Sequence, residues 1–483
     1  MLNSLSQLGD VAGRRSTLLV VAVVVVLAAG LGYLASGRVL ALVALLAASL
    51  LLLRQPVLGL MGLVVVALFV PIQFNTGTAV SVNVTVFAVP ALLAIWIVFM
   101  TRNGAIGLVP SRTNRPLLLF VVAGLFSLLI GRVTWDPSVP RPAGFLVVQL
   151  AQWAIFALSA GAFLLAGNVI RDEVWLRRLT FFFLGAGGLA AIFYALPALT
   201  EIVSPYTTAA LYRAPFWLLL ATLGGGQFLF NRKLPLPWRL FFAILLGVAI
   251  YYTVVQQIAQ RERSALSSFI GLAAGLGALI WLRFPRLRWP VMIVFAALAV
   301  NEVFVSRVYQ FIGGEDEWFR SVGPRLALIG RVLGVTWRNP FTGLGPAAYR
   351  IYAGLEPLRY EHIVWIDPRV SSHNNYVDIF SHVGLIGSGL FLWFMAELGV
   401  LGWRLRKRFA DGFKAAYVNG MLAAWVGIIV LMMTADWFLP FIYNISFDGF
   451  QASVLVWLFF GGLILLEQRV RSEGGQEPAV QNE

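Results

Sequence analysis

A histidine flanked by polar side chains stands near the end of the longest polar stretch of this chain. It lies in the segment Ser371–Ser381, SSHNNYVDIFS, which leads directly into a hydrophobic run. Near neutral pH an imidazole can act as a general base toward a hydroxyl group if its neighbours hold the ring in place. Asn374 and Asn375 are candidates for that positioning or for a substrate contact. We therefore take His373 as the candidate catalytic residue, with a purely structural hydrogen bond as its alternative role.

Metal chemistry has little support in this sequence. The three histidines, His362, His373 and His382, are separated by 11 and 9 residues, and these spacings match no common pattern of zinc ligands. The chain has no cysteine, which excludes disulfides, thiolate nucleophiles and thiolate metal sites. The acidic segment 315–317 reads as a solvated loop. We expect no metal ion and no other cofactor.

Three arginines form a second group that could do chemistry. Arg213 begins a hydrophobic run in LYRAPFWLLLA, Arg263 begins another in QRERSALSSFIG, and Arg325 lies in the long polar stretch. A single arginine at a membrane surface often extends toward lipid phosphates. Several on one face suit a diphosphate, because a guanidinium stays protonated and binds phosphate oxygens in a bidentate manner. We expect these arginines to bind such a substrate, with Arg325 alternatively fixing the loop that carries it.

The elements that must position these residues are membrane helices. Of the 483 residues, 59% are hydrophobic and 12% are charged. Apolar runs long enough to cross about 30 Å of hydrocarbon recur along the chain. The first run follows Arg14 and Arg15 without a cleavage site after it, and reads as a retained span rather than a signal peptide. We expect an all-α polytopic membrane protein with about fourteen spans, in the range of twelve to fourteen. The expected spans are 16–36, 39–53, 56–73, 83–101, 116–131, 144–167, 175–198, 214–230, 238–257, 264–282, 289–306, 377–403, 416–434 and 448–468.

The distribution of basic residues sets the orientation of these spans. With the N-terminus inside, 22 of the 36 lysines and arginines fall in cytoplasmic segments. Eight of the other 14 lie in one long outer loop, where the charge rule has little weight. Both termini are therefore expected in the cytoplasm. The net charge of +14 then reflects topology and contact with the inner leaflet, so we expect no nucleic acid partner.

The long outer loop is the connection with the most polar character, and a loop of this length is more often functional than idle. Within it, Pro324–Trp337 has helical apolar spacing and predicts a helix at the outer mouth of the bundle. The following segment 339–350, NPFTGLGPAAYR, predicts a rigid turn that allows close backbone approach. The chain thus divides into a helical bundle over 1–306, the outer loop over 307–376, a second group of spans over 377–468 and a cytoplasmic tail over 469–483.

Several short motifs follow one another over roughly residues 210–390. They are Tyr212-Arg213, Arg263-Ser264-Ala265, Arg325, the Asn339-Pro340 to Pro346 turn, Ser372-His373-Asn374 and Val383-Gly384 to Gly387. In this order they resemble the O-antigen ligase and O-antigen polymerase superfamily of bacterial membrane proteins. The turn followed by His-Asn and then Gly-Leu-Ile-Gly is more specific than any single motif. Two positions depart from the family pattern, since Glu262 stands where serine is usual and His382 where an acidic residue is common.

The resemblance implies a GT-C-like fold in the bacterial inner membrane, with an outward-facing cavity beneath a periplasmic loop. It also implies an inverting glycosyltransferase that takes a glycan from an undecaprenyl-diphosphate-linked donor to a hydroxyl of a glycan or lipid A-core acceptor. His373 would then deprotonate the acceptor, and Asn374 would hold the imidazole or a sugar. Arg213 and Arg263 would bind the diphosphate and offset its charge without a metal ion, and Arg325 would bind the diphosphate or fix the loop.

Two other classes of protein stay open on the sequence. A transporter or flippase of lipid-linked glycan also needs many spans and a basic cavity, but such proteins usually carry related halves and ionisable residues within the spans. Here we find no convincing internal repeat, and the main charges within spans, Glu302 and Glu397, lie near span ends. A scaffold of an envelope-polysaccharide complex would leave the His-Asn motif inert. Among enzymes, ligase, polymerase and transfer to protein all remain open.

Overall fold

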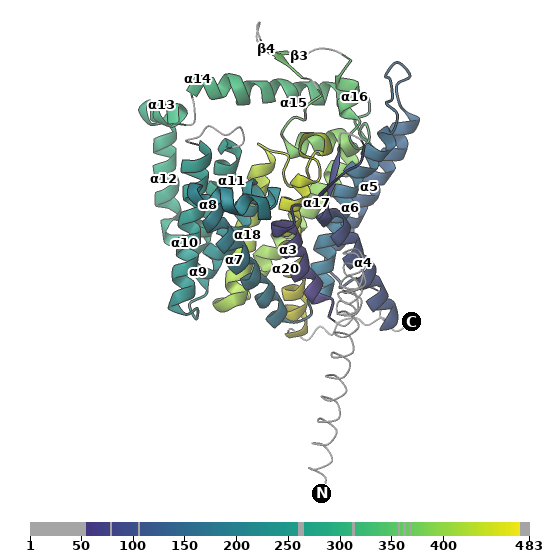
Figure 1. Ribbon diagram of the computed structural model, residues 1–483. Coiled ribbons are helices and arrows are strands. Elements are labelled where there is room, and N and C mark those ends of the chain that lie inside the picture. The colour runs from purple at the N-terminus through teal and green to yellow at the C-terminus, as the bar shows by residue number, and fades with distance from the viewer. Residues whose placement is uncertain are drawn as a thin grey trace.

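The computed structural model describes residues 55–77, 80–104, 107–258, 265–311, 314–355, 358–360, 364–367 and 369–473. Within these ranges nine helical segments are long and apolar enough to cross a membrane, so the chain is a polytopic helical membrane protein. They are α4 (Val84–Arg102), α5 (Asn114–Val133), α6 (Phe145–Val169), α7 (Glu173–Ala195), α10 continued by the π-helix η3 (Leu236–Ile258), α11 (Ala265–Arg283), α17 (Asn375–Arg406), α18 (Gly412–Met432) and α20 (Asp448–Glu473). Two shorter apolar helices, α3 (Val57–Phe69) and α9 (Ala214–Phe230), pack among them (Figure 1).

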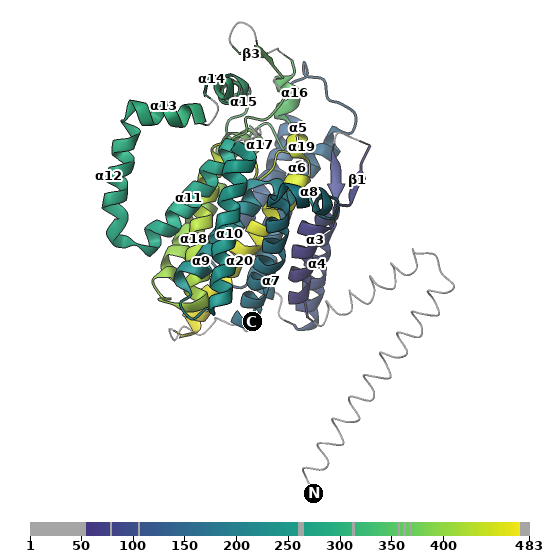
Figure 2. The same cartoon turned by 60° about the vertical axis from the view of Figure 1, so that its left-hand side comes forward.

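Most of the expected spans coincide with a helix, and one does not. The segments 16–36 and 39–53 lie outside the described residues. The expectation of one continuous span over 289–306 is wrong, because two helices share this segment. α12 (Arg288–Ala299) ends within it, and α13 (Glu302–Phe311) begins after Val300 and Asn301. Figure 2 shows α12 set apart from α11, with α13 lying across its upper end. Asn301 accepts the first backbone hydrogen bond of α13, from the Val305 N–H at 2.9 Å, which is the position that asparagine favours at a helix start.

The buried centre of the bundle consists of α6, α9, α18 and α20. Every residue in the most apolar 18-residue window of α20 is buried, as is 78% of that window in α18. Glycines let these helices approach closely, since a Cβ atom added at Gly226 of α9 would lie 2.5 Å from the Ala416 carbonyl oxygen of α18. The segments that follow α18 and precede α20 therefore start from a rigid frame.

The outer layer lies across one end of the bundle, as Figure 1 shows. It contains α15 (Gly323–Thr336) and α16 (Tyr349–Ala353), followed by the antiparallel pair β3 (Leu358–Tyr360) and β4 (Val364–Ile366). The helix expected at 324–337 is thus confirmed to within one residue. The other short elements are β1 (Gln73–Asn75), paired with β2 (Ser81–Asn83), α8 (Pro197–Val203), η1 (Ser204–Tyr206), η2 (Ala209–Tyr212), η4 (Pro285–Leu287), α14 (Gly314–Glu317), η5 (Trp318–Val322) and α19 (Ile442–Ile445).

Helix α17 is broken near its outer end at Gly384, which has φ 62° and ψ −166°. The break frees the N–H groups of Leu385 and Ile386, and these donate to the carbonyl oxygens of Pro340 and Phe341 at 2.9 and 3.1 Å. In return the Leu344 N–H donates to the Ser381 carbonyl at 2.9 Å. The turn after α15 therefore fills the gap in α17 and replaces the lost helical hydrogen bonds.

The orientation of the bundle is tested by reporter fusions. We expect alkaline phosphatase to be active when fused after Gly354, in the outer layer, and inactive after Arg408, because the basic residues gather at the end that carries Arg408. A fusion after Lys233, in another basic loop, serves as a second inactive control. Activity after Arg408 and none after Gly354 would invert the orientation and place His373 in the cytoplasm.

Candidate active site

The candidate active site is a histidine-aspartate pair beneath the outer layer. His373 immediately precedes α17, and its Nδ1 lies 3.5 Å from Oδ1 of Asp436, in the segment that joins α18 to α19. The Asp436 side chain is 2% exposed and that of His373 is 31% exposed. The Nδ1 edge of the imidazole is thus held by a buried carboxylate, while the rest of the ring stays partly accessible. This is the arrangement in which a carboxylate orients a base and stabilises its protonated form.

Asp436 is itself held by polar neighbours. The Asn444 side-chain amide donates to its Oδ2 at 3.0 Å, and the Ser371 hydroxyl donates to the same oxygen at 3.4 Å. Asn444 also donates to the Ser371 hydroxyl, which closes a three-membered network. Burial raises the pKa of Asp436, but hydrogen bonds from His373 and Asn444 and the charge of His373 outweigh it, so the pKa lies below its usual value. The carboxylate is therefore ionised at neutral pH.

The backbone that presents His373 is unusual. His373 has φ 53°, in the left-handed region that residues other than glycine adopt in only a few per cent of cases. Its N–H donates to the Ser371 hydroxyl at 3.2 Å. The Ser372 hydroxyl donates to Asp378 Oδ1 at 2.7 Å, and the Ser372 N–H donates to the same oxygen at 3.1 Å. These hydrogen bonds hold the strained turn, and such local strain is concentrated at functional sites.

The two asparagines after His373 hold this turn in place. The Asn374 side-chain oxygen caps α17 by accepting from the N–H groups of Tyr376 and Val377, and its amide donates to the Met433 carbonyl at 2.9 Å. The Asn375 amide donates to the Leu439 carbonyl at 2.7 Å, and its oxygen accepts from the Phe438 N–H. Both asparagines thus tie the start of α17 to the segment that carries Asp436. A substrate contact by Asn374 stays a prediction.

The other two histidines take different places. His382 is 2% exposed, its Nδ1 accepts from the Ala347 N–H at 3.3 Å, and its ring stacks on Phe441. It is a structural residue of the junction between α17 and the turn near Gly345. His362 lies outside the described residues. In the described part of the chain, no group of three or more histidine, aspartate and glutamate side chains is arranged to hold a metal ion.

Two of the three arginines expected to bind a phosphate, Arg213 and Arg325, lie in the described part of the chain. Arg325 of α15 donates to the Ser267 hydroxyl on α11 and to the Thr434 carbonyl, both at 3.3 Å, which ties the outer layer to the segment of Asp436. Arg213 starts α9, with its guanidinium 5.1 Å from the centre of the Tyr212 ring. Its buried Nε has no hydrogen-bond partner among the described residues. Arg263 lies outside the described residues.

Sequence reasoning missed Asp436 and Asn444. Both lie in the connection 435–447, and Asp436 is the single charged residue there. An isolated carboxylate in a short, largely apolar connection was the available signal, because a charge in such a place is costly unless it has a partner. The partner itself, His373, could not be identified from the sequence, because the two spans α17 and α18 separate it from Asp436.

Residues 258–394 match the family model described as O-antigen ligase. The matched region runs from the end of η3 through the outer layer to the middle of α17, and it includes Arg325, His373 and Gly384. Asp436 lies beyond it. No curated protein matches the chain.

Proposed function

We propose that this chain, whose residues 258–394 match the O-antigen ligase family model, is a membrane-embedded inverting glycosyltransferase of the O-antigen ligase and polymerase superfamily. It takes a glycan from an undecaprenyl-diphosphate-linked donor and joins it to a hydroxyl of a glycan or lipid A-core acceptor. The His373–Asp436 pair carries this proposal, because a partly exposed imidazole held by a buried carboxylate is suited to activate a hydroxyl. The site faces the periplasm, and both termini lie on the cytoplasmic side of the inner membrane.

The reaction is a single displacement at the anomeric carbon. The acceptor hydroxyl gives its proton to Nε2 of His373, and its oxygen forms the new bond to the anomeric carbon. The bond from that carbon to the diphosphate oxygen breaks at the opposite face, and the electron pair leaves with the lipid diphosphate, which inverts the configuration. Asp436 stabilises the imidazolium that forms, without taking the proton itself.

The leaving diphosphate needs positive charge, which arginines supply. Arg213 is the candidate in the described structure, since it is partly exposed at the start of α9, and Arg263 is the second candidate. Arg325 serves instead to fix the outer layer, because its guanidinium is engaged by Ser267 and Thr434. This role was one of the two expected from the sequence. Asn374 likewise acts in this proposal by positioning His373 through the start of α17.

The alternatives make less use of the observed geometry. A transporter or flippase has no need of a strained histidine held by a buried carboxylate, and neither has a scaffold protein. Ligase and polymerase share the chemistry above and differ in the acceptor pocket. Both therefore remain within the proposal.

The proposal is tested by transfer with purified protein. We expect glycan to move from an undecaprenyl-diphosphate-linked donor to an acceptor sugar, with inverted anomeric configuration, and the rate to be unchanged in excess EDTA because arginines balance the diphosphate charge. Product is followed by mass spectrometry and its configuration by proton NMR. The control is protein carrying His373→Ala. Loss of transfer in EDTA with recovery on adding Mg²⁺ or Mn²⁺ would contradict the metal-independent mechanism, and retention of configuration would contradict single displacement.

A further inference from the structure

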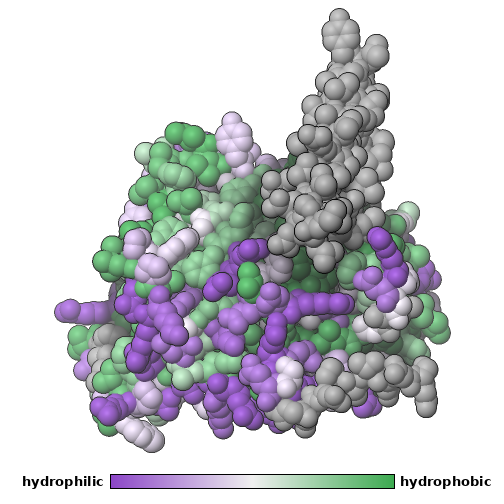
Figure 3. Space-filling view, turned by 90° about the horizontal axis from the view of Figure 1, so that it is seen from below, coloured by the Kyte–Doolittle hydropathy of each residue, from purple (hydrophilic) through white to green (hydrophobic). Residues whose placement is uncertain are grey.

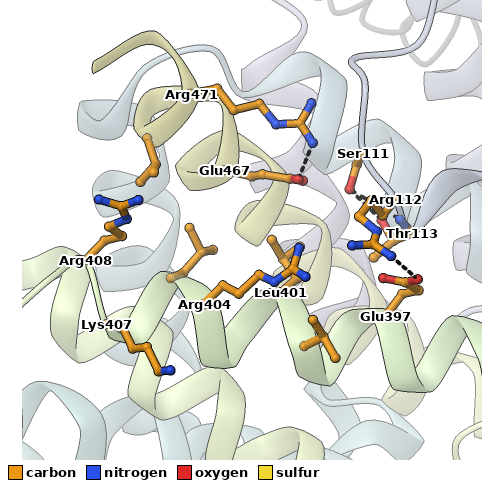
Figure 4. Close-up of a pocket in the computed structure, with 13 residues that line it drawn as sticks. Ser111, Arg112, Thr113, Glu397, Leu401, Arg404, Lys407, Arg408, Glu467 and Arg471 are labelled. Carbon is orange, nitrogen blue, oxygen red and sulfur yellow. Dashed lines mark hydrogen bonds and ion pairs between the residues drawn. The ribbon is translucent and has the colours of Figure 1, made fainter. Parts of the chain in front are cut away.

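A basic pocket of about 630 Å³ opens at the end of the bundle opposite His373. It lies between the start of α5 and the ends of α17 and α20. Two ion pairs border it, as Figure 4 shows: Arg112 with Glu397 at 3.2 Å, and Arg471 with Glu467 at 2.5 Å. Both carboxylates of the pocket lining are thus engaged by an arginine.

Three further cations of the pocket have no such partner. Arg404, Lys407 and Arg408 all come from the end of α17 and the turn after it, and within the described residues none of them forms an ion pair. Figure 4 shows Arg404 directed into the space between the two ion pairs and Arg408 at the side of the pocket, whereas Lys407 points away from that space. The pocket therefore has positive charge in excess, on a face where hydrophilic side chains gather (Figure 3).

The basic pocket continues into an apolar groove. This groove, of about 870 Å³, runs between α11, α17 and α18 and shares Val400, Arg404 and Lys407 with the pocket. Trp403 and Trp425 line it, and Trp403 is 42% exposed. Tryptophan is enriched where a helix passes from the hydrocarbon core to the headgroup region. Charge and apolar surface thus adjoin at the depth where a phospholipid has its phosphate and the start of its acyl chains.

We propose that this pocket and groove bind one anionic phospholipid of the membrane leaflet on that side. Its phosphate is held by Arg404 and Arg408, and its acyl chains lie in the groove along α17 and α18. A guanidinium matches a phosphate in geometry and charge, and basic pockets between spans on the cytoplasmic side are suited to anionic headgroups. A soluble phosphate would use the pocket alone and gain nothing from the groove. The site is separate from the transfer site and does not depend on the proposed function.

The headgroup contacts are tested with the purified full-length chain in phosphatidylcholine bicelles, titrated with phosphatidylglycerol and followed by native mass spectrometry. We expect R404Q/R408Q to weaken phosphatidylglycerol binding roughly 10- to 30-fold, since each basic residue near an anionic lipid contributes a factor of about five. The matched control is R177Q/R232Q. It removes two exposed arginines, Arg177 and Arg232, from the end of the bundle that carries Arg408. Arg177 belongs to the start of α7, where Glu173 pairs with Lys414. The Arg232 N–H donates to Asp411, which follows Arg408 closely in the chain. The control is expected to bind within twofold of the unchanged chain.

The groove is tested by filling it. Ala396→Trp places an indole in the groove and is expected to weaken phosphatidylglycerol binding roughly tenfold, because several methylene groups lose their buried site. Ala243→Trp, on the exposed face of α10, is the control and is expected to have no effect.

Four results would overturn the proposal. Equal losses in R404Q/R408Q and R177Q/R232Q would mean that only general surface charge acts. Binding of glycerol phosphate as strong as that of the whole lipid would assign the pocket to a soluble anion. Binding of phosphatidylcholine as strong as that of phosphatidylglycerol would remove the role of the arginines. Tighter binding of undecaprenyl phosphate, with the same loss in R404Q/R408Q, would assign the site to an isoprenoid lipid.

Discussion

His373→Ala lowers the turnover of glycan transfer by roughly 100- to 10,000-fold, the usual loss when a general base is removed. The free energy of unfolding also falls, because the buried Asp436 carboxylate loses its imidazole partner, but the protein stays folded since Asn444 and Ser371 still hydrogen-bond that carboxylate. Donor binding is retained, since the histidine acts on the acceptor hydroxyl. Turnover is measured under saturating donor and acceptor, and donor affinity is measured separately by equilibrium binding.

Asp436 is a positioning residue in this scheme, and its variant separates the two roles. Asp436→Asn keeps the shape of the side chain but removes the charge that stabilises the imidazolium, and we expect turnover to fall about 100-fold with KM unchanged. A residue that only supported the fold would lower the melting temperature and the amount of active protein, without a selective loss of turnover per folded molecule. His362→Ala is the matched control and should leave transfer near its normal rate.

Arg213→Ala is the contrasting variant. It removes a charge-assisted contact to the diphosphate, so donor affinity falls together with turnover, by about 1.5 to 3 kcal/mol of binding free energy. Arg213→Lys restores only part of this loss, because an ammonium group cannot form the bidentate contact.

Near-normal transfer by His373→Ala, or an equal fall for His373→Ala and His362→Ala, would remove His373 from the mechanism.

Gly384→Ala prevents the junction between α17 and the outer layer from forming. The backbone at Gly384, with φ 62° and ψ −166°, lies in a region that is essentially restricted to glycine and costs on the order of 1 to 3 kcal/mol otherwise. A Cβ atom there would also collide with the Phe341 carbonyl and the Gly343 N–H. We expect the variant to lose several kcal/mol of stability, which is a large share of the roughly 5 to 15 kcal/mol of a typical domain. The melting temperature in detergent and the yield of folded protein are the measurements.

Gly389→Ala is the matched control on the same helix. Gly389 is helical, and nothing lies within 4 Å of a Cβ atom added there. Alanine in a helix interior is more favourable than glycine by about 0.5 to 1 kcal/mol, so this variant is expected to be neutral or slightly more stable. Equal stability of the two variants would show that the contacts at the α17 break do not support the fold.

The membrane helices could be predicted because each depends on a local property of the chain. An apolar run such as 144–167 is long enough to cross a bilayer wherever it stands, and α6 forms there. The wrong prediction of one span over 289–306 also came from reading the local apolar content alone. Its apolar content is nearly continuous, and only the capping preference of Asn301 ahead of Glu302 indicates that the helix ends and restarts.

The site could be predicted only in part, because the candidate base is recognisable in the sequence whereas its hydrogen-bond partners depend on the fold. His373 stands out as a rare residue in a polar segment. For Asn374 and Asn375 the sequence left two roles open, because an asparagine has the same donors and acceptors toward a sugar as toward the backbone. Only the structure shows that their amides donate to the carbonyl groups of Met433 and Leu439. The pairing of the Pro340–Gly345 turn with Gly384 was visible as two motifs in order, but not as hydrogen bonds between them.

The order in which the chain is made determines when the site becomes complete. When α17 has entered the membrane, His373 is present without its carboxylate, because Asp436 follows α18. The Asp436 connection is then fixed by Gln152 of α6, which donates to the Pro440 carbonyl at 3.0 Å and accepts from the Ile442 N–H at 2.8 Å. The early helix α6 thus holds a hydrogen-bond partner for the Asp436 connection, which is synthesised much later. A partly synthesised chain holds the base without its partner, so activity begins only when insertion is nearly finished.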